Sequence, residues 1–308
     1  MGMGEAGGRE RERESNELEL SFFLCLSSRF DHRPSFSMSP LHVTSSVDQK
    51  DDCERPISTI VFIIAMDAEA LPILKRFNLA EDSAFFPGLP WIRYHGFYKD
   101  LQLNVIWPGK DLALGVNNIG TIPAALVTYA SIQALKPDLI INAGTAGGYV
   151  SKGANIEDVF LVSSVAFHHR RIPLPGRDLY AIGRRQSFSM PLLSTELQLK
   201  DGALSTGDSF DICPPDEAFI TANNANLVDM EGAAVAYVAG LLNVPTIFLK
   251  VVSNAIDGGE PSVEEFHQNL AVAMSALDQT VAEVLDFISG KCLSELSISE
   301  TSSLGSTR

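Results

Sequence analysis

The sequence predicts a single α/β domain with a central mixed, mostly parallel sheet flanked by helices. Apolar runs of strand length, such as "STIVFIIAM" and "PTIFLKVVS", alternate along the chain with segments of helical spacing. Several of these runs are apolar throughout, as expected of strands that are covered on both faces. A chain of 308 residues with 45% hydrophobic content is long enough to bury such a core.

We expect the domain to span residues 55–290. Residues 1–54 begin with alternating charges in "GRERERESNE" and continue as an irregular Ser-rich run, which favours a disordered N-terminal extension. Its glutamates are unusual in an organelle-targeting peptide, so a cytoplasmic protein is expected. Residues 291–308 are mostly polar and are predicted to form a flexible tail.

The first half of the domain alternates between strand and helix. "STIVFIIAM" predicts a buried strand, and "DAEALPILKRF" predicts the helix that follows it. "PWIRYHGFYKDLQLNVIWPG" alternates and turns at "YKD", which favours a hairpin. "TIPAALVTYASIQAL" is predicted to be a helix, and "PDLIINAGTAGG" a strand that runs into a glycine loop.

The second half continues this pattern. "DVFLVSSVAFH" predicts a strand, followed by a Pro- and Arg-rich loop, a helical segment near "FSMPLLSTEL" and a short strand in "DGALSTGDSF". "LVDMEGAAVAYVAGLL" has small residues at helical spacing, so it is predicted to be a helix packed closely against the sheet. After the strand "PTIFLKVVS", a closing helix runs from "SVEEF" to about Ile288. Ser262 and Glu265 have the spacing of a capping box at its start.

Composition excludes several classes of function. A net charge of −15 gives no basic surface for nucleic acid. The four cysteines lie far apart and no histidine has metal-ligand spacing, so neither a disulfide framework nor a metal site is predicted. No apolar run reaches the roughly 18 to 20 residues that span a bilayer, so no membrane partner is expected.

Four polar clusters, "MDAE", "GTAGG", "GDSF" and "SNAID", follow predicted strands. Because open α/β sheets bind ligands at the carboxyl ends of their strands, the four together predict a ligand site. Some of these features also have a structural explanation when taken alone. "GTAGG" can be a tight turn at a strand end. Asp67 and Glu69 can complement a helix N-terminus, and Glu231, beside small apolar residues, needs either ligand hydroxyls or a distant Lys or Arg as partner. The run "HHRR", which could contact an anion, is more typical of a solvated basic loop.

The order of these motifs resembles that of the nucleoside phosphorylase/nucleosidase superfamily. "FIIAMDAEA", "INAGTAGG", "LSTGDSF", "DMEGAAVA" and "LKVVSNAIDG" follow one another as in that family, from about Pro56 to Gly290. Runs such as "SIQALKPDLIINAGT" and "HRRIPLP" are most similar to the plant 5′-methylthioadenosine nucleosidases, relatives of the bacterial methylthioadenosine/S-adenosylhomocysteine nucleosidases. The resemblance implies one α/β domain, usually in a homodimer.

The resemblance further implies a hydrolase of methionine salvage that needs no cofactor. Water would cleave the N-glycosidic bond of a thionucleoside, methylthioadenosine, to give adenine and methylthioribose, and it stays open whether S-adenosylhomocysteine is also cleaved. By its motif position, Glu69 would activate or position the water. The implied substrate-binding residues are Thr145 near sugar and water, Phe210 and Asp211 at adenine, Met230 and Glu231 at the ribose, and Ser253. Carboxylates near the ribose suit an oxocarbenium-like transition state.

One position departs from the family pattern. The family has a general-acid aspartate after a Ser or Thr at the end of the strand, and this chain has Ser253-Asn254 there. An amide can donate a hydrogen bond to adenine but has no proton to give. A positioned general acid typically increases the reaction rate about 10²- to 10⁴-fold, so its absence leads to two hypotheses. The chain is either a nucleosidase of reduced activity or a catalytically silent, nucleoside-binding or storage-like member. Asp257 matches a second acidic position of the family rather than a relocated acid.

Overall fold

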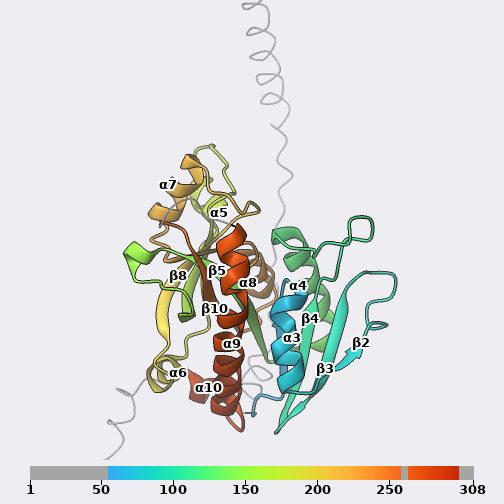
Figure 1. Cartoon of the computed structure of the whole chain (residues 1–308). Helices are drawn as coiled ribbons and strands as arrows, with labels where there is room; N and C mark the ends of the chain where they lie inside the picture. Colours follow the sequence, from blue (N-terminus) through green and yellow to red (C-terminus); the bar gives the residue numbers. More distant parts are fainter. Residues whose placement is uncertain (1–54, 258–262, 298–308) are drawn as a thin grey trace, which may run out of the picture. The chain divides into compact units, whose positions relative to one another are not determined.

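A central mixed sheet organises the residues that the computed structural model describes, 55–257 and 263–297 (Figure 1). Its longer strands are β1 (Thr59–Ile63), β3 (Ile92–Tyr98), β4 (Leu101–Trp107), β5 (Leu139–Gly148), β6 (Val159–Phe167), β8 (Lys200–Thr206) and β10 (Thr246–Ala255). The shorter ones are β2 (Ala80–Asp82), β7 (Arg185–Gln186) and β9 (Leu227–Asp229). The order is β10-β6-β8-β9-β5-β1-β4-β3-β2, with β7 beside β6. β1 runs parallel to both of its neighbours, which confirms the predicted mixed sheet with a parallel centre.

Five of these strands close into a ring. β10 pairs with both β6 and β5, while β5 also reaches β6 through β9 and β8. At the end of β5, Gly147 is paired with Asn254 of β10 on one side and with Val228 of β9 on the other. The ends of β10 and β9 therefore lie on either side of β5.

Helices cover both faces of the sheet. α3 (Asp67–Arg76) and α9 (Val263–Ile288) pack together on the face toward the viewer in Figure 1, and α4 (Thr121–Leu135) packs with α8 (Gly232–Leu241) behind the sheet. In β1, Ile60 and Phe62 enter the core beneath α3 and α9, whereas Val61 and Ile63 enter the core beneath α4 and α8. This two-sided burial explains why the strand is apolar throughout.

The structure corrects two sequence predictions about element types. The segment "GTAGG" is not a loop, because β5 continues to Gly148. The segment "LVDMEGAAVAYVAGLL" is not one helix, because it begins as β9 and becomes helical only at Gly232. Among the described elements, α5 (Asp178–Ile182), α7 (Pro214–Ala222), the 3-10 turn η1 (Val150–Lys152), β2 and β7 were not predicted, whereas α6 (Pro191–Glu196) was.

The domain also continues beyond the predicted boundary at residue 290. α10 spans Leu293–Leu296, and Leu296 is 1% exposed in the core shared with α3 and α9. The Ile57 N–H donates to the Lys291 carbonyl at 2.9 Å, which joins the two ends of the domain. The prediction of a flexible tail is therefore wrong for residues 291–297. Residues 1–54 and 298–308 and the capping residue Ser262 lie outside the described residues.

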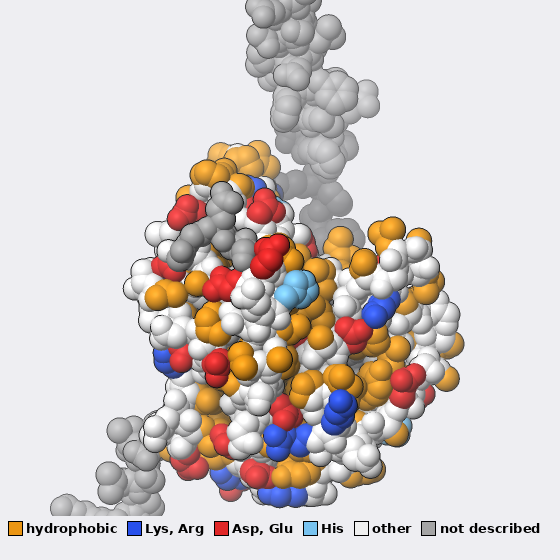
Figure 2. All heavy atoms as spheres, viewed as in Figure 1, with side chains coloured by type: hydrophobic (Ala, Val, Ile, Leu, Met, Phe, Trp, Pro, Cys, Tyr) orange, Lys and Arg blue, Asp and Glu red, His pale blue; other side chains and the backbone are white. Residues whose placement is uncertain are grey.

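None of the helices in the described part of the chain has the length and apolar character needed to cross a bilayer. Apolar side chains are nevertheless exposed around the start of α4. They include Ile122, Leu126 and Tyr129 on the helix and Leu112, Leu114 and Val116 in the loop before it, all more than half exposed. Figure 2 shows hydrophobic side chains in the upper right of the molecule, where Figure 1 draws this loop.

Candidate active site

A cavity of about 340 Å³ gathers residues from all four polar clusters. Every predicted site residue except Asp211 lines it: Glu69, Thr145, Phe210, Met230, Glu231, Ser253 and Asn254. Asp211 is exposed and lies outside the set of lining residues. The convergence predicted from the strand ends is therefore present in the fold.

Glu69 is held on the cavity wall by α3 and β5. It is 2% exposed, and its Oε1 accepts hydrogen bonds from the N–H and the hydroxyl of Thr145, both at 2.7 Å. Its Oε2 accepts from the Met66 N–H at 3.1 Å, so the side chain also caps its own helix. Burial raises the pKa of Glu69, although the Thr145 hydrogen bonds and Lys250 oppose the shift. A carboxylate with a raised pKa is a better proton acceptor for water.

The glycine at position 144 makes this arrangement possible. A Cβ on Gly144 would lie 3.0 Å from Oε1 of Glu69, inside the usual contact distance. Because β5 has no side chain there, the carboxylate can lie directly against the strand backbone. The glycine at position 144 is therefore explained by the close approach of the Glu69 carboxylate to the β5 backbone, not by the turn expected from the sequence.

Glu231 precedes α8 and is 9% exposed. Its Oε1 accepts a hydrogen bond from the Gly120 N–H at 2.9 Å. Burial, reinforced by the nearby Asp229 charge, raises the pKa of Glu231 to about 7, while Lys250 and the Gly120 N–H act in the opposite direction. Of the two partners considered from the sequence, a distant Lys or Arg is not paired directly with Glu231, because Lys250 forms its ion pair with Asp229.

This Lys250–Asp229 ion pair is a feature that the sequence analysis missed. The two groups are 2.9 Å apart, with side chains 2% and 1% exposed. Asp229 also accepts from the Thr206 hydroxyl at 2.6 Å and from the Gly232 N–H at 2.8 Å, so it caps α8 as well. The signal was a lone lysine within the apolar strand "TIFLKVVS", because lysine is seldom fully buried without a partner.

A β-bulge brings Ser253 and Asn254 to the same cavity. The β5–β10 register shifts between Val252 and Asn254, which lets two successive side chains face one site although they would normally alternate. The Ser253 hydroxyl donates to Oδ1 of Asn254 at 3.1 Å. The Asn254 Nδ2 is the amide atom nearest to Gly147, 3.2 Å from where a Cβ on that glycine would lie.

Asp257 serves a different purpose. Its carboxylate accepts the Val150 N–H at 2.7 Å and the Ser151 N–H at 2.9 Å, at the start of η1. These hydrogen bonds lower the pKa of Asp257 despite some burial. It is outside the cavity lining, which supports the interpretation that it is not a relocated acid.

Aromatic and apolar side chains also line the cavity. Phe210 and Asn254 also line a small adjoining space of about 40 Å³ with Ser209, Ile212 and Ile256. The main cavity is further lined by Met66, Ile119, Val263, Phe266 and His267. Phe266 makes an edge contact with Phe210, with ring centroids 6.4 Å apart. None of these five was predicted as a site residue, although Val263, Phe266 and His267 share one face of α9.

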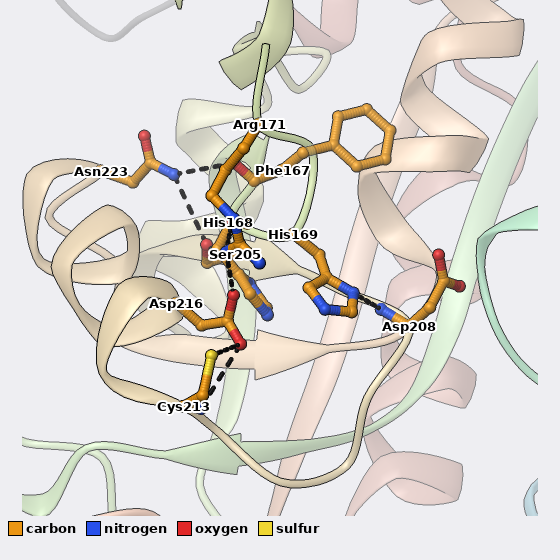
Figure 3. Close-up of polar contacts among 9 residues, drawn as sticks. All are labelled: Phe167, His168, His169, Arg171, Ser205, Asp208, Cys213, Asp216 and Asn223. Carbon is orange, nitrogen blue, oxygen red and sulfur yellow. Dashed lines mark hydrogen bonds and ion pairs between the residues drawn. The ribbon is translucent and has the colours of Figure 1, made fainter. Parts of the chain in front are cut away.

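The "HHRR" segment is not the solvated basic loop that was predicted (Figure 3). His168 is 2% exposed, and its Nδ1 lies 3.1 Å from the Ser205 hydroxyl. Burial lowers the pKa of His168. Arg171 forms an ion pair with Asp216 at the start of α7, and Arg170 stacks on Phe167 and Tyr180. The segment also contacts the "GDSF" strand end, because the His168 N–H donates to the Thr206 carbonyl at 3.0 Å and the Asp208 N–H donates to Nδ1 of His169 at 3.2 Å.

The site favours a bound or developing cation. Glu69, Asp229 and Glu231 lie around a single ammonium group, that of Lys250. With all four ionised, the cluster carries an excess of negative charge in a low-dielectric setting, where it acts strongly on nearby charge. Among the described residues, no group of three or more His, Cys, Asp or Glu could hold a metal ion.

Several known proteins are similar to this chain. A family model, the phosphorylase superfamily, matches residues 59–286. A 5′-methylthioadenosine nucleosidase of Arabidopsis thaliana is 59% identical over 81% of this chain and 94% of its own length. A 5′-methylthioadenosine/S-adenosylhomocysteine nucleosidase of the same plant is 57% identical over 79% and 96%. The solved structure of Arabidopsis thaliana 5′-methylthioadenosine nucleosidase in apo form superposes with a TM-score of 0.77, covering 79% of this chain and 100% of that one.

Replacing Lys250 with Met should destabilise the protein strongly. The substitution leaves Asp229 buried without its counter-charge, a change that typically costs about 3–5 kcal/mol. The matched control is Lys99→Met, which removes an exposed ion pair to Asp286 and should have no measurable effect. Urea unfolding of both variants measures the difference, and equal stabilities would show that the buried pair has no special weight.

Replacing Glu231 with Gln should stabilise the unliganded protein above neutral pH. Folding raises the pKa of this carboxyl from 4.5 to about 7, so its ionisation removes stability as the pH rises through that interval. The gain in stability from Glu231→Gln should be near zero at pH 4 and about 3 kcal/mol at pH 8. Thermal unfolding should record an increase in Tm of roughly 6 to 12 °C at pH 8. The control is Glu196→Gln, at an exposed glutamate. A gain in stability from Glu231→Gln that does not depend on pH would contradict this explanation.

Proposed function

The chain belongs to the phosphorylase superfamily and, within it, to the methylthioadenosine nucleosidases, and we propose that it hydrolyses 5′-methylthioadenosine to adenine and methylthioribose. The observation that carries the proposal is the pair of buried carboxylates, Glu69 and Glu231, on the wall of one cavity. Its lining also includes Thr145, Phe210 and Met230, which lie in the motifs that resemble those of the family. Methionine salvage is the metabolic setting that we propose for this reaction.

The cavity supports a consistent placement of the substrate. The ribose hydroxyls donate to Glu231, and adenine lies in the end lined by Phe210 and Asn254. The methylthio group then points to the end lined by Met66, Ile119 and Val263, whose apolar side chains suit a thioether. S-adenosylhomocysteine is the second candidate substrate, because it differs from 5′-methylthioadenosine only in its 5′ substituent.

Glu69 is proposed as the base. Water near Glu69 and Thr145 adds its oxygen to C1′ while the C1′–N9 bond breaks and its electron pair goes to adenine. Glu69 accepts the proton that water loses, and the net negative cluster stabilises the positive charge that develops on the sugar. Asn254 can donate a hydrogen bond to the departing base, whereas the proton that completes adenine comes from solvent.

Water is favoured over phosphate as the nucleophile. No Lys or Arg is among the described residues that line the cavity. Phosphate needs such groups to balance its charge, and an ionised Glu69 would repel it. A phosphorolytic reaction is therefore the less consistent alternative in this site.

A second candidate function is nucleoside binding without turnover, and Asn254 favours it. The cavity keeps the residues proposed to bind sugar and base, while the position of the family's general acid has no transferable proton. Binding and hydrolysis are therefore separable properties of this site.

We also propose that the protein is a homodimer. The support is the exposed apolar surface made by Ile122, Leu126 and Tyr129 with the loop before α4, because such clusters usually mark interaction sites. Sedimentation should give a mass of about twice 33.3 kDa. Leu126→Glu should shift the mass toward the monomer, whereas Leu179→Glu, at another exposed leucine, should leave the dimer intact. A monomeric wild type would contradict this proposal.

Restoring an acid at position 254 should raise the rate of hydrolysis. We expect Asn254→Asp to increase kcat for adenine release about 10²- to 10⁴-fold, with a much smaller change in affinity. Adenine release at high enzyme concentration measures kcat, and calorimetry measures binding of 5′-methylthioadenosine. Binding without turnover in the wild type would favour the silent nucleoside-binding function. If Asn254→Asp gains nothing, the missing acid is not the main limit on the rate.

A further inference from the structure

Asp208, in the "GDSF" segment, caps a helix that is remote from it in the sequence. Its Oδ1 accepts the Thr121 N–H at 2.7 Å, and its Oδ2 accepts the Thr121 hydroxyl at 2.7 Å. Thr121 is the first residue of α4. The N-cap residue before it, Gly120, has no side chain that could cap the helix. A carboxylate from the strand-end segment after β8 therefore fixes the start of α4.

The preceding residue, Gly120, connects this cap to the cavity. Its N–H donates to Glu231 at 2.9 Å. Gly120 has φ 103° and ψ 178°, a conformation open essentially only to glycine, and a Cβ there would lie 2.9 Å from Oδ1 of Asp208. The Gly120-Thr121 backbone thus lies between two carboxylates, one outside the cavity and one inside it.

Asp208 is itself fixed from the other side. Its backbone N–H donates to Nδ1 of His169 at 3.2 Å, and Figure 3 shows its carboxylate directed away from that histidine. Two residues further on, Phe210 lines the cavity at the proposed adenine end. One short segment therefore contacts both the base end of the cavity and the backbone that supports Glu231.

We propose that Asp208 is a positioning residue for Glu231. By holding Thr121, it fixes the orientation of the Gly120 N–H, and this N–H fixes the carboxylate that receives the ribose hydroxyls. Asp208 therefore couples base recognition to ribose recognition without touching the sugar. The role at the ribose rests on the proposed function, whereas the coupling between the two carboxylates does not.

The first test uses the nucleoside hydroxyls as a probe. Asp208→Ala should weaken binding of 5′-methylthioadenosine by roughly 10- to 100-fold, but should weaken binding of its 2′,3′-dideoxy analogue by less than about threefold. The analogue lacks the groups that Glu231 binds, so it does not sense the position of Glu231. Asp208→Asn, which keeps one acceptor for the Thr121 N–H, should restore most of the affinity.

The matched control for this test is Asp138→Ala. Asp138 also accepts backbone N–H groups and a hydroxyl, those of Ser58 and Thr59, but at the opposite end of β5. Its loss should lower stability and reduce the affinity for both nucleosides equally, as a purely structural defect does. If Asp208→Ala reduces both affinities by the same factor, the positioning role is wrong.

The second test needs no nucleoside. In a double-mutant cycle at pH 8, Glu231→Gln should raise Tm more in the Asp208→Ala background than in the wild type, because the carboxylate there has lost part of its support. Simple repulsion between the two acids would give the opposite sign. In the Asp138→Ala background, Glu231→Gln should raise Tm by the same amount as in the wild type.

The two tests separate the inference from the proposed function. If the double-mutant cycle shows coupling between Asp208 and Glu231 in a protein that binds neither nucleoside, the positioning role stands and the proposed function is wrong. An additive cycle would overturn the positioning role even if binding and turnover are observed. If Asp208→Ala does not fold, Thr121→Val removes only the hydroxyl hydrogen bond, and it should give the same pattern at smaller amplitude.

Discussion

The site depends on one buried ion pair, between Lys250 and Asp229. Lys250 belongs to β10 and Asp229 to β9, two strands of the ring that do not pair with each other. The ion pair therefore joins elements that lie on either side of β5, in addition to the backbone hydrogen bonds. Because Asp229 also caps α8, the same carboxylate fixes the helix that begins beside Glu231. Desolvation of these charges is costly, so the arrangement is stable only as a complete network.

This network sets the electrostatic character of the cavity. The Lys250 charge lowers the pKa of Glu69 and of Glu231, against the larger effect of burial. A single ammonium cannot neutralise three carboxylates, so the cavity is costly to keep ionised when it is empty and favourable for a cationic transition state. The instability of the empty site and its proposed ability to cleave a glycosidic bond thus have the same physical origin.

The sequence was informative where local pattern and burial coincide. The apolar strands could be predicted because both of their faces are covered, and the site residues could be predicted because they lie in compact motifs. Contacts between distant residues left no such pattern. The Gly120 support of Glu231 and the Asp208 cap of α4 join positions 111 and 87 residues apart. His168 looked solvated because its neighbours are basic, yet Arg170 and Arg171 are used in stacking and pairing. Short elements such as α5 and β7 lack the length for a periodic signal.

The same electrostatics explain what the amide at position 254 changes. An aspartate there would be buried and would add a further negative charge to the cavity that Glu69 and Glu231 line, and both effects would raise its pKa. The site is therefore suited to keep an acid protonated near neutral pH, as a general acid requires. Asn254 resembles that protonated acid in shape and in its ability to donate a hydrogen bond, and Ser253 holds its oxygen at 3.1 Å. It has no proton to transfer, so in the proposed reaction the substitution keeps a hydrogen-bond donor for binding and removes the acid step.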